Sequence, residues 1–327
     1  MRLFIVIAVI AVLSALTALA FLPRAESGAG DESALPYIVT TTAQIGDLAR
    51  HVAGDTARVE SLMGEGTDPH LYRPTRADRV KLQRANIIMT NGLHLEGKMI
   101  ELLEKLAEEK PVIEMAQALP PSDILQTASA AHDPHIWMDV SNWIAALGLV
   151  QRALSERYPD HAALYRANAA EYKNELKTLD DYAHKTIGSI PENRRALVTA
   201  HDAFSYMGAA YGLEVFGIQG ISTDSEAGLH HIEQLVGLLV NRNIPAVFVE
   251  SSVSERNIKA LIEGAAARGH IVKIGGELFS DAMGAPGTYE GTYIGMIDHN
   301  ITTITHALGG NAPERGMKGR LSHALSN

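Results

Sequence analysis

The sequence predicts an α/β protein with two similar lobes, each a mostly parallel sheet flanked by helices, joined by one long rigid helix. Short apolar strand candidates alternate with helical patterns in the first half of the chain, and the same alternation restarts in the second half. A long helical pattern without internal glycine or proline lies between the two series. Alternation of this kind is typical of parallel sheets with helices on both faces.

The first half of the chain contains three strand candidates, each followed by a helical pattern. The strand candidates are residues 37–42, 58–63 and 86–91. The helical patterns that follow them are residues 43–52, 75–85 and 95–110. A further helical pattern covers residues 142–158. We therefore expect the N-terminal lobe to span residues 36–158.

Residues 159–190 are predicted to form the helix that joins the two lobes. The pattern over residues 161–186 contains no glycine or proline, and Pro191 follows it at a point where a helix stops. Bending a continuous helix breaks backbone hydrogen bonds that a loop does not have to break. The connection therefore predicts limited movement between the lobes.

The alternation of strands and helices restarts after Pro191. The strand candidates of this second series are residues 196–200, 214–218, 246–250 and 270–275. Each is followed by a helical segment, so we expect residues 191–327 to form the C-terminal lobe. In open α/β sheets, ligands bind beyond the carboxyl ends of the strands, and the loops at those ends are therefore where a site is expected.

Residues 1–25 have the pattern of an export signal. Arg2 precedes a long apolar run over residues 3–22, which ends near a small-residue cleavage site. We expect a cleaved signal peptide followed by a polar tether over residues 26–35, with an uncleaved membrane anchor as the alternative, because the run is long enough to span a bilayer. The chain has no cysteine, which excludes a lipid-modified cysteine, disulfides and thiolate metal sites.

The composition excludes some classes of partner. The chain has 327 residues, of which 46% are hydrophobic and 20% charged, as in soluble globular proteins. Its formal net charge is −10 at pH 7, and it has no cluster of basic residues. An acidic exported protein of this kind suits cations and is a poor candidate for binding nucleic acid.

Three histidines and one aspartate are the candidate metal ligands. They are His70 in TDPHLY, His135 in HDPHIWMD, His201 directly after the strand candidate ALVTA, and Asp281 in GGELFSDAMG. Three imidazoles and one carboxylate can enclose a divalent transition metal ion without a thiolate. The tripeptide DPH occurs at both His70 and His135, where its aspartate and proline would hold the imidazole on a rigid turn.

Two other classes of protein stay open at this point. The chain has 14 histidines, so these histidines are also compatible with an adhesin or structural periplasmic domain that binds no stoichiometric metal. His70 or His135, the His201 and Asp202 pair, and Asp281 also follow the H…HD…D order of metal-dependent phosphohydrolases, although those domains are all-helical. The chain has no H-E-x-x-H motif, and four protein ligands would leave no open position for a reacting water.

Five motifs carry a family resemblance over about residues 37–308. They are DPH-x-Y-x-P, DPHIWMDV, AHDAFSYMGAAYGLEV, VFVESSVSERNIKAL and GGELFSDAMGAPGTYEGTYIGMIDHN. In combination they resemble the metal-specific solute-binding proteins of bacterial ABC importers, and within these the TroA-type members. The resemblance implies two four-stranded α/β lobes linked by one rigid helix, with a single metal ion held between them.

By motif, the resemblance places the metal ligands at His70 and His135 of the first lobe and at His201 and Asp281 of the second. Manganese-type members have glutamate where His201 stands, whereas zinc-type and TroA-type members have histidine. Because zinc outranks manganese at nitrogen-rich sites, we expect one Zn²⁺ per chain, with Mn²⁺ or Fe²⁺ as the alternative. Asp281 would bind through one oxygen in a tetrahedron or through both in a five-coordinate site.

The resemblance also implies a role and partners. We expect a periplasmic monomer without enzymatic activity that captures the ion with high affinity. It would deliver the ion to a membrane permease and its cytoplasmic ATPase subunit, and would not bind nucleic acid. Metal binding should weaken as the pH falls through roughly 6.5, where histidines become charged.

Residues near the candidate ligands have simpler expected roles. Asp68, Asp133 and Asp202 are candidates to fix an imidazole through its second nitrogen, although turn formation is the expected role of Asp68 and Asp133. We expect Glu96 to be a favourable charge at a helix N-terminus and Trp137 to belong to the core. Four further histidines are expected to be solvated, namely His94, His132, His230 and His231.

Overall fold

The computed structural model describes residues 35–127, 132–224 and 228–322. The predicted signal peptide and nearly all of the predicted tether lie outside these residues. Pro36–Asn327 form one compact unit. None of the described helices combines the length and the apolar character that a membrane span requires.

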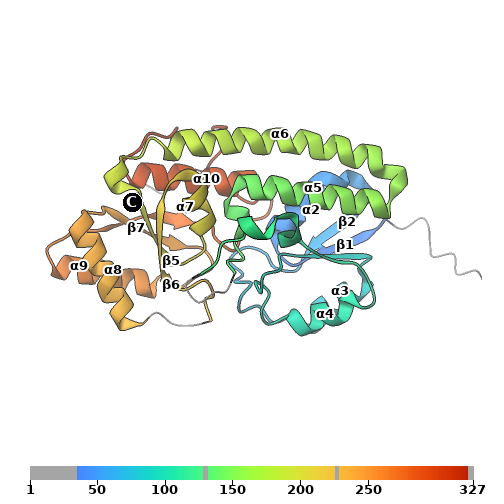
Figure 1. The fold of residues 1–327 in the computed structure, drawn as a ribbon, viewed down its shortest axis with the longest axis horizontal. Coiled ribbons are helices and arrows are strands. Elements are labelled where there is room, and N and C mark those ends of the chain that lie inside the picture. The colour runs from blue at the N-terminus through green and yellow to red at the C-terminus, as the bar shows by residue number, and fades with distance from the viewer. Residues whose placement is uncertain (1–34, 128–131, 225–227, 323–327) are drawn as a thin grey trace, which may run out of the picture. The chain divides into compact units, whose positions relative to one another are not determined.

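The N-terminal half is built on a four-stranded parallel sheet with the strand order β2-β1-β3-β4 (Figure 1). Its strands are β1 (Tyr37–Thr40), β2 (Arg58–Ser61), β3 (Ile87–Thr90) and β4 (Val112–Glu114). The first three strands confirm the sequence prediction. The prediction missed β4, because a strand of three residues is too short to show a periodic pattern.

Helices cover both faces of this sheet. One face packs against α2 (Ala43–Ala53) and α5 (Val140–Arg157), and the other packs against α3 (Arg76–Arg84) and α4 (Ile100–Ala107). The alternation of side chains along a strand explains this arrangement, because neighbouring residues point to opposite faces. In β1, Ile38 belongs to the cluster under α2 and α5, and Val39 belongs to the cluster under α3 and α4.

The C-terminal half repeats this strand order. Its strands are β5 (Ala196–His201), β6 (Glu214–Gln219), β7 (Ala246–Glu250) and β8 (Lys273–Leu278). β5 pairs with β6 and β7 with β8, both in parallel, and β5 lies against β7. The order is therefore β6-β5-β7-β8, although the part of the chain that the structure describes has no hydrogen-bonded ladder between β5 and β7.

Strand β8 begins three residues later than the predicted strand over residues 270–275. Gly275 and Gly276 lie inside it. A Cβ atom at Gly275 would come within 2.7 Å of both Phe248 and Ala307, so the backbone passes too close to its neighbours for a side chain. Gly275 therefore marks a place where the strand packs closely against its neighbours.

Four helices flank the second sheet. They are α7 (Ser205–Tyr211), α8 (Leu229–Arg242), α9 (Arg256–Ala267) and α10 (Tyr293–Ala307). α8 and α9 pack on the outer face, where Leu235 and Leu261 contact the strands in a separate cluster. α7 and α10 lie on the inner face, toward the long helix (Figure 1).

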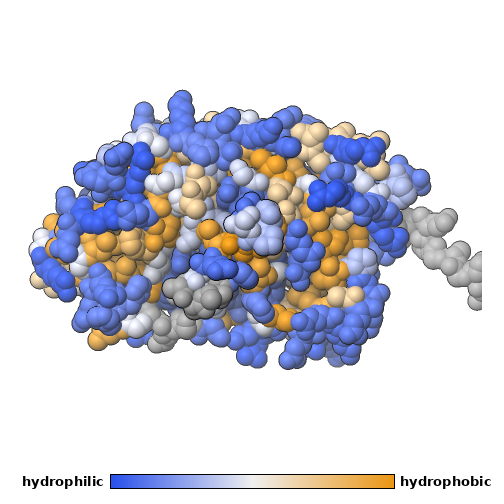
Figure 2. Space-filling view, viewed as in Figure 1, coloured by the Kyte–Doolittle hydropathy of each residue, from blue (hydrophilic) through white to orange (hydrophobic). Residues whose placement is uncertain are grey.

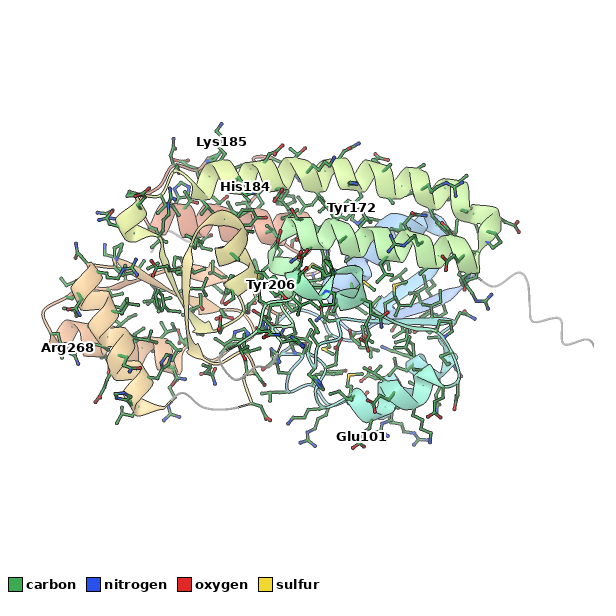
Figure 3. All side chains as sticks on the ribbon, in the orientation of Figure 1. Glu101, Tyr172, His184, Lys185, Tyr206 and Arg268 are labelled. Carbon is green, nitrogen blue, oxygen red and sulfur yellow. The ribbon has the colours of Figure 1, made fainter. Side chains whose placement is uncertain are left out.

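The long helix α6 (Ala162–Ile187) runs along both halves and confirms the predicted joining helix (Figure 1). Its outer side is solvated: Figure 2 shows mostly hydrophilic residues along the edge where α6 runs, and Lys185 points outward in Figure 3. Its buried side joins one hydrophobic cluster that takes in both sheets, represented by Ile38, Ile87, Leu176, Leu179, Leu197 and Phe248. The inner faces of the two halves therefore share a core.

Candidate metal centre

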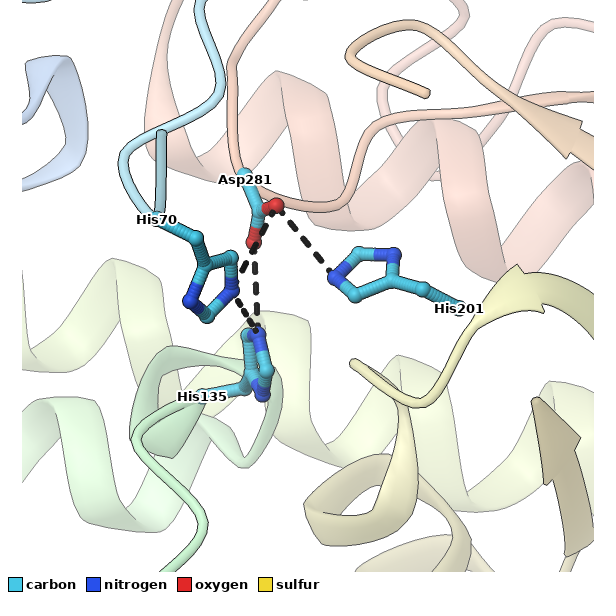
Figure 4. Close-up of side chains that lie close together, drawn as sticks. All are labelled: His70, His135, His201 and Asp281. Carbon is cyan, nitrogen blue, oxygen red and sulfur yellow. Dashed lines mark hydrogen bonds and ion pairs between the residues drawn. The ribbon is translucent and has the colours of Figure 1, made fainter. Parts of the chain in front are cut away.

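The four candidate ligands lie together at the carboxyl ends of strands from both halves (Figure 4). His70 belongs to the loop between β2 and α3, and His135 to the loop that follows β4. His201 is the last residue of β5, and Asp281 follows β8. One potential ligand atom of each residue lies within 4.8 Å of those of the other three, and all four residues are buried.

The distances between these atoms suit a small cation. His135 Nε2 lies 3.3 Å from His70 Nε2 and 3.4 Å from Asp281 Oδ1, and His201 Nε2 lies 3.3 Å from Asp281 Oδ2. Zn–N bonds of about 2.0–2.1 Å give a tetrahedron with edges of about 3.3–3.4 Å. His70 Nε2 lies farther from Asp281 Oδ2, at 3.9 Å. Both carboxylate oxygens face imidazoles.

Several polar atoms of this cluster have no hydrogen-bond partner among the described residues. They are both carboxylate oxygens of Asp281 and Nε2 of His201. Burial of such atoms without a partner is costly, and more so for a charged carboxylate. A bound cation would satisfy all three atoms at once, so the donor set and its surroundings fit a metal ion.

The buried charged groups of this cluster shift one another's pKa values. Burial opposes the charged form of His135, but Asp133 and Asp281 outweigh burial and raise the pKa of His135 to about 9. Burial likewise opposes charge on His201, whose pKa nevertheless stands well above its ordinary value because of Glu250 and Asp281. Burial would raise the pKa of Asp281, yet the imidazoles, His201 foremost, hold that pKa well below its usual range.

His70 differs from the other two histidines. Burial lowers its pKa to about 4, so its imidazole is neutral at pH 7. Asp68 forms the expected turn, since its Oδ1 accepts a hydrogen bond of 2.8 Å from the backbone N–H of His70. The other oxygen, Oδ2, accepts a hydrogen bond from Thr223 Oγ1 of the C-terminal half.

Asp133 does more than form the turn predicted for it. Its Oδ1 accepts hydrogen bonds from both the backbone N–H of His135, at 2.9 Å, and the ring nitrogen Nδ1, at 2.7 Å. A carboxylate on the second nitrogen fixes the orientation of a metal-binding imidazole. Asp133 therefore forms the expected turn and also fixes the imidazole of His135.

Glu250 is the partner of His201, and sequence reasoning missed it. Glu250 ends β7, next to the end of β5, and its Oε2 lies 2.5 Å from Nδ1 of His201. The candidate expected from the sequence, Asp202, instead accepts a hydrogen bond from Ser205 Oγ. The available signal was a glutamate directly after the buried run AVFV, at the end of a strand where ligands gather.

Glu96 is not at a helix N-terminus. Helix α4 begins at Ile100, and Glu96 is buried, where Oε1 accepts hydrogen bonds from Thr41 Oγ1 and from the backbone N–H of Asn91. Burial raises its pKa. Asn91 in turn donates from Nδ2 to the carbonyl oxygen of Pro134, beside His135. The prediction for Glu96 was wrong because nothing local in the sequence shows its burial.

Trp137 and Tyr206 tie the two halves together around the site. Trp137 is buried as predicted, packs its ring edge-on against His135, and donates from Nε1 to the carbonyl oxygen of Ser280, beside Asp281. Tyr206 lies near the middle of the molecule in Figure 3 and donates to the carbonyl oxygen of Asp133. The four histidines expected to be solvated are exposed, namely His94, His132, His230 and His231.

A family of periplasmic proteins described as zinc-uptake complex component A, or ZnuA, matches residues 38–307. The chain belongs to this family. The ZnuA family comprises metal-binding substrate-binding proteins of ABC importers, which are not enzymes. Membership of this family excludes the phosphohydrolase alternative. The Asp202 carboxylate that the phosphohydrolase motif requires also lies outside the metal-ligand cluster.

Two relatives match this protein over most of its length. The manganese-binding lipoprotein MntA of Bacillus subtilis is 47% identical over 298 residues, which are 89% of this chain and 97% of the relative. The zinc-binding protein TroA of Treponema pallidum is 44% identical over 273 residues, which are 84% of this chain and 89% of the relative.

A solved structure of the periplasmic zinc-binding protein TroA from Treponema pallidum supports the fold. It superposes with a TM-score of 0.82 and covers 84% of this chain and 99% of the TroA chain. The match confirms the predicted α/β fold with helix-flanked parallel sheets and a long joining helix.

Proposed function

We propose that this protein captures one Zn²⁺ outside the cytoplasm, through His70, His135, His201 and Asp281, and delivers it to a membrane permease driven by a cytoplasmic ATPase. The observation that carries the proposal is the convergence of three imidazole nitrogens on both oxygens of one buried carboxylate. Nitrogen-rich donor sets favour zinc over manganese. Four protein ligands enclose an ion, which suits capture and release better than catalysis.

Manganese is the second candidate, with iron as a further alternative. Two observations favour it: the relative from Bacillus subtilis is named for manganese, and the carboxylate oxygens of Asp281 both face the centre, which suits a coordination number above four. A relative from Yersinia pestis, 30% identical, is named as an iron-binding protein. If the bound ion is Mn²⁺ or Fe²⁺, the role in metal capture stays the same and only the proposed preference for zinc is wrong.

Metal content tests the proposal directly. The protein would be exported, purified without added metal or chelator, and analysed by inductively coupled plasma mass spectrometry. We expect about one zinc per chain, and about one manganese or iron would keep the function and overturn the selectivity. No bound metal, together with no thermal shift on adding Zn²⁺ or Mn²⁺, would contradict the capture role, because a ligand at 100 times its Kd adds about 2.7 kcal/mol of stability.

A further inference from the structure

We propose that Glu250 is a positioning residue, which keeps the proton of the His201 imidazole on Nδ1 so that Nε2 is the nitrogen offered to the metal ion. The inference rests on the proposed function, because it concerns how one candidate ligand presents its donor atom. It follows from two hydrogen bonds, from the burial of both side chains, and from a difference between Glu250 and Asp133.

Each carboxylate oxygen of Glu250 accepts a hydrogen bond from a different donor of His201. Oε1 accepts the backbone N–H at 2.8 Å, and Oε2 accepts from Nδ1 at 2.5 Å. A carboxylate offers only acceptors, so Nδ1 must carry a proton. Nε2, which lies 3.3 Å from Asp281 Oδ2, is then the nitrogen that can release its proton to solvent and bind a cation through its lone pair. Both side chains are fully buried, so water does not replace either bond.

Asp133 holds His135 in a different way. Its Oδ1 accepts both the backbone N–H and Nδ1 of His135, and its Oδ2 has no hydrogen-bond partner among the described residues. In Asp133→Asn, the amide oxygen can take the place of Oδ1 and keep both bonds, while the amide nitrogen takes the place of Oδ2. This substitution therefore removes the charge and leaves the proton of His135 on Nδ1.

Glu250→Gln cannot preserve its two bonds. A glutamine has one acceptor oxygen, and the backbone N–H of His201 needs it, because a backbone amide is always a donor. The amide nitrogen then faces Nδ1 of His201, which must become an acceptor and move its proton to Nε2. A protonated Nε2 has no lone pair for a metal ion. In the catalytic triad of serine proteases, the same exchange of carboxylate for amide leaves the histidine in the wrong tautomer.

The two substitutions form a matched pair, because each removes one buried carboxylate charge beside one candidate ligand. Zn²⁺ affinity would be measured for both variants and the natural protein by competition with a chromophoric chelator at pH 7.5. Loss of a carboxylate partner typically costs 10–100-fold in metal affinity, so we expect a loss of at least about 100-fold in Glu250→Gln and of about tenfold or less in Asp133→Asn. Equal losses in the two variants would overturn the proposal.

A nitrogen-15 NMR spectrum of histidine-labelled protein supplies a readout that a merely structural role would not move. In the natural protein loaded with Zn²⁺, we expect His201 to carry its proton on Nδ1 and to bind through Nε2. In Glu250→Gln, the neutral ring should carry its proton on Nε2. Binding of zinc through Nδ1 of His201 in the natural protein would overturn the proposal, even where the variant does not fold.

These results separate the inference from the function on which it rests. A natural protein that binds neither Zn²⁺ nor Mn²⁺ contradicts the proposed function. A natural protein that binds Zn²⁺, together with a Glu250→Gln variant that folds, binds Zn²⁺ equally well and keeps its proton on Nδ1, contradicts only the role of Glu250.

Discussion

Gln44 of α2 donates a hydrogen bond of 2.8 Å from Nε2 to the backbone carbonyl oxygen of Asp281, which lies 237 positions away in the sequence. The neighbouring carbonyl oxygen, that of Ser280, accepts a hydrogen bond from Trp137. The loop that carries the candidate carboxylate ligand of the C-terminal half is therefore held by two donors from the N-terminal part of the chain. Its position depends on contacts that only the folded chain brings together.

Gln44→Ala should destabilise the protein and weaken Zn²⁺ binding. The substitution leaves the buried carbonyl oxygen of Asp281 without its donor, and a buried group left without its partner costs about 1–3 kcal/mol. Urea unfolding would give the free energy of unfolding, and chelator competition the affinity. Gln151→Ala is the matched control, because Gln151 donates to Ser155 within α5 and should leave Zn²⁺ affinity unchanged. Similar effects of the two substitutions on affinity would contradict this role of Gln44.

Asp281→Ala should remove the stabilisation that Zn²⁺ gives. The change takes away the one carboxylate of the candidate centre and leaves three imidazoles, so an amount of zinc that adds about 2.7 kcal/mol to the natural protein should add almost nothing. Melting curves with and without zinc measure this. Asp202→Ala serves as the control, since Asp202 is next to His201 and its carboxylate accepts a hydrogen bond from Ser205. An undiminished zinc response in Asp281→Ala would remove this residue from the site.

His201→Glu should shift the preference from zinc toward manganese only when Glu250 is changed as well. Alone, the new carboxylate would face the buried carboxylate of Glu250, which now accepts from Nδ1 of His201, and the repulsion should weaken the binding of both metals. The double variant His201→Glu with Glu250→Gln places an amide donor opposite the new carboxylate, and oxygen ligands favour manganese relative to zinc. The ratio of the two dissociation constants measures the shift, and an unchanged ratio would refute the selectivity argument.

Zn²⁺ binding at pH 7 should release about two protons. The raised pKa values of His135, about 9, and of His201 mean that both rings are charged at pH 7, whereas His70, with a pKa of about 4, is neutral. A metal ion must displace a proton from each charged ring, so affinity should fall as the pH decreases below about 9, well above the value of 6.5 expected from an ordinary histidine. Calorimetry in buffers of different ionisation enthalpy counts these protons, and a count of zero would contradict the assignment.

Local patterns in the sequence predicted most of the strands, the long helix and the candidate ligands, but missed the three-residue strand β4. The strands and the helix α6 follow from apolar periodicity and from the absence of helix breakers between residues 161 and 186. The histidines of the two DPH turns and His201 at the end of β5 could be selected because turn chemistry and strand ends are local features. That the four residues bind metal stays a prediction, as do the lobe boundaries 36–158, 159–190 and 191–327.

The partners of the ligands depend on long-range packing and were less predictable. Glu250 contacts His201 only because β5 and β7 lie side by side, and the spacing of these residues in the sequence does not predict that contact. Glu96 was expected at a helix N-terminus and is instead buried, because burial of a carboxylate is rare and depends on its tertiary surroundings. The strand predicted over residues 270–275 lies at Lys273–Leu278, and Gly275 lies inside it, closely packed against Phe248 of another strand.

The apolar interior that both halves share has a consequence for how an ion enters and leaves. A hinge that swung the halves apart would have to split the hydrophobic cluster that holds Leu197 and Phe248 together with residues of α6, and each Å² of apolar surface so exposed would cost about 25 cal/mol. Between Gly64 and Thr75, the loop that carries His70 contributes only Tyr72 to the described hydrophobic clusters, and its Leu71 is exposed. We therefore expect cation exchange to proceed through brief excursions of that loop, on the microsecond-to-millisecond timescale of local opening, while the frame around it keeps its shape.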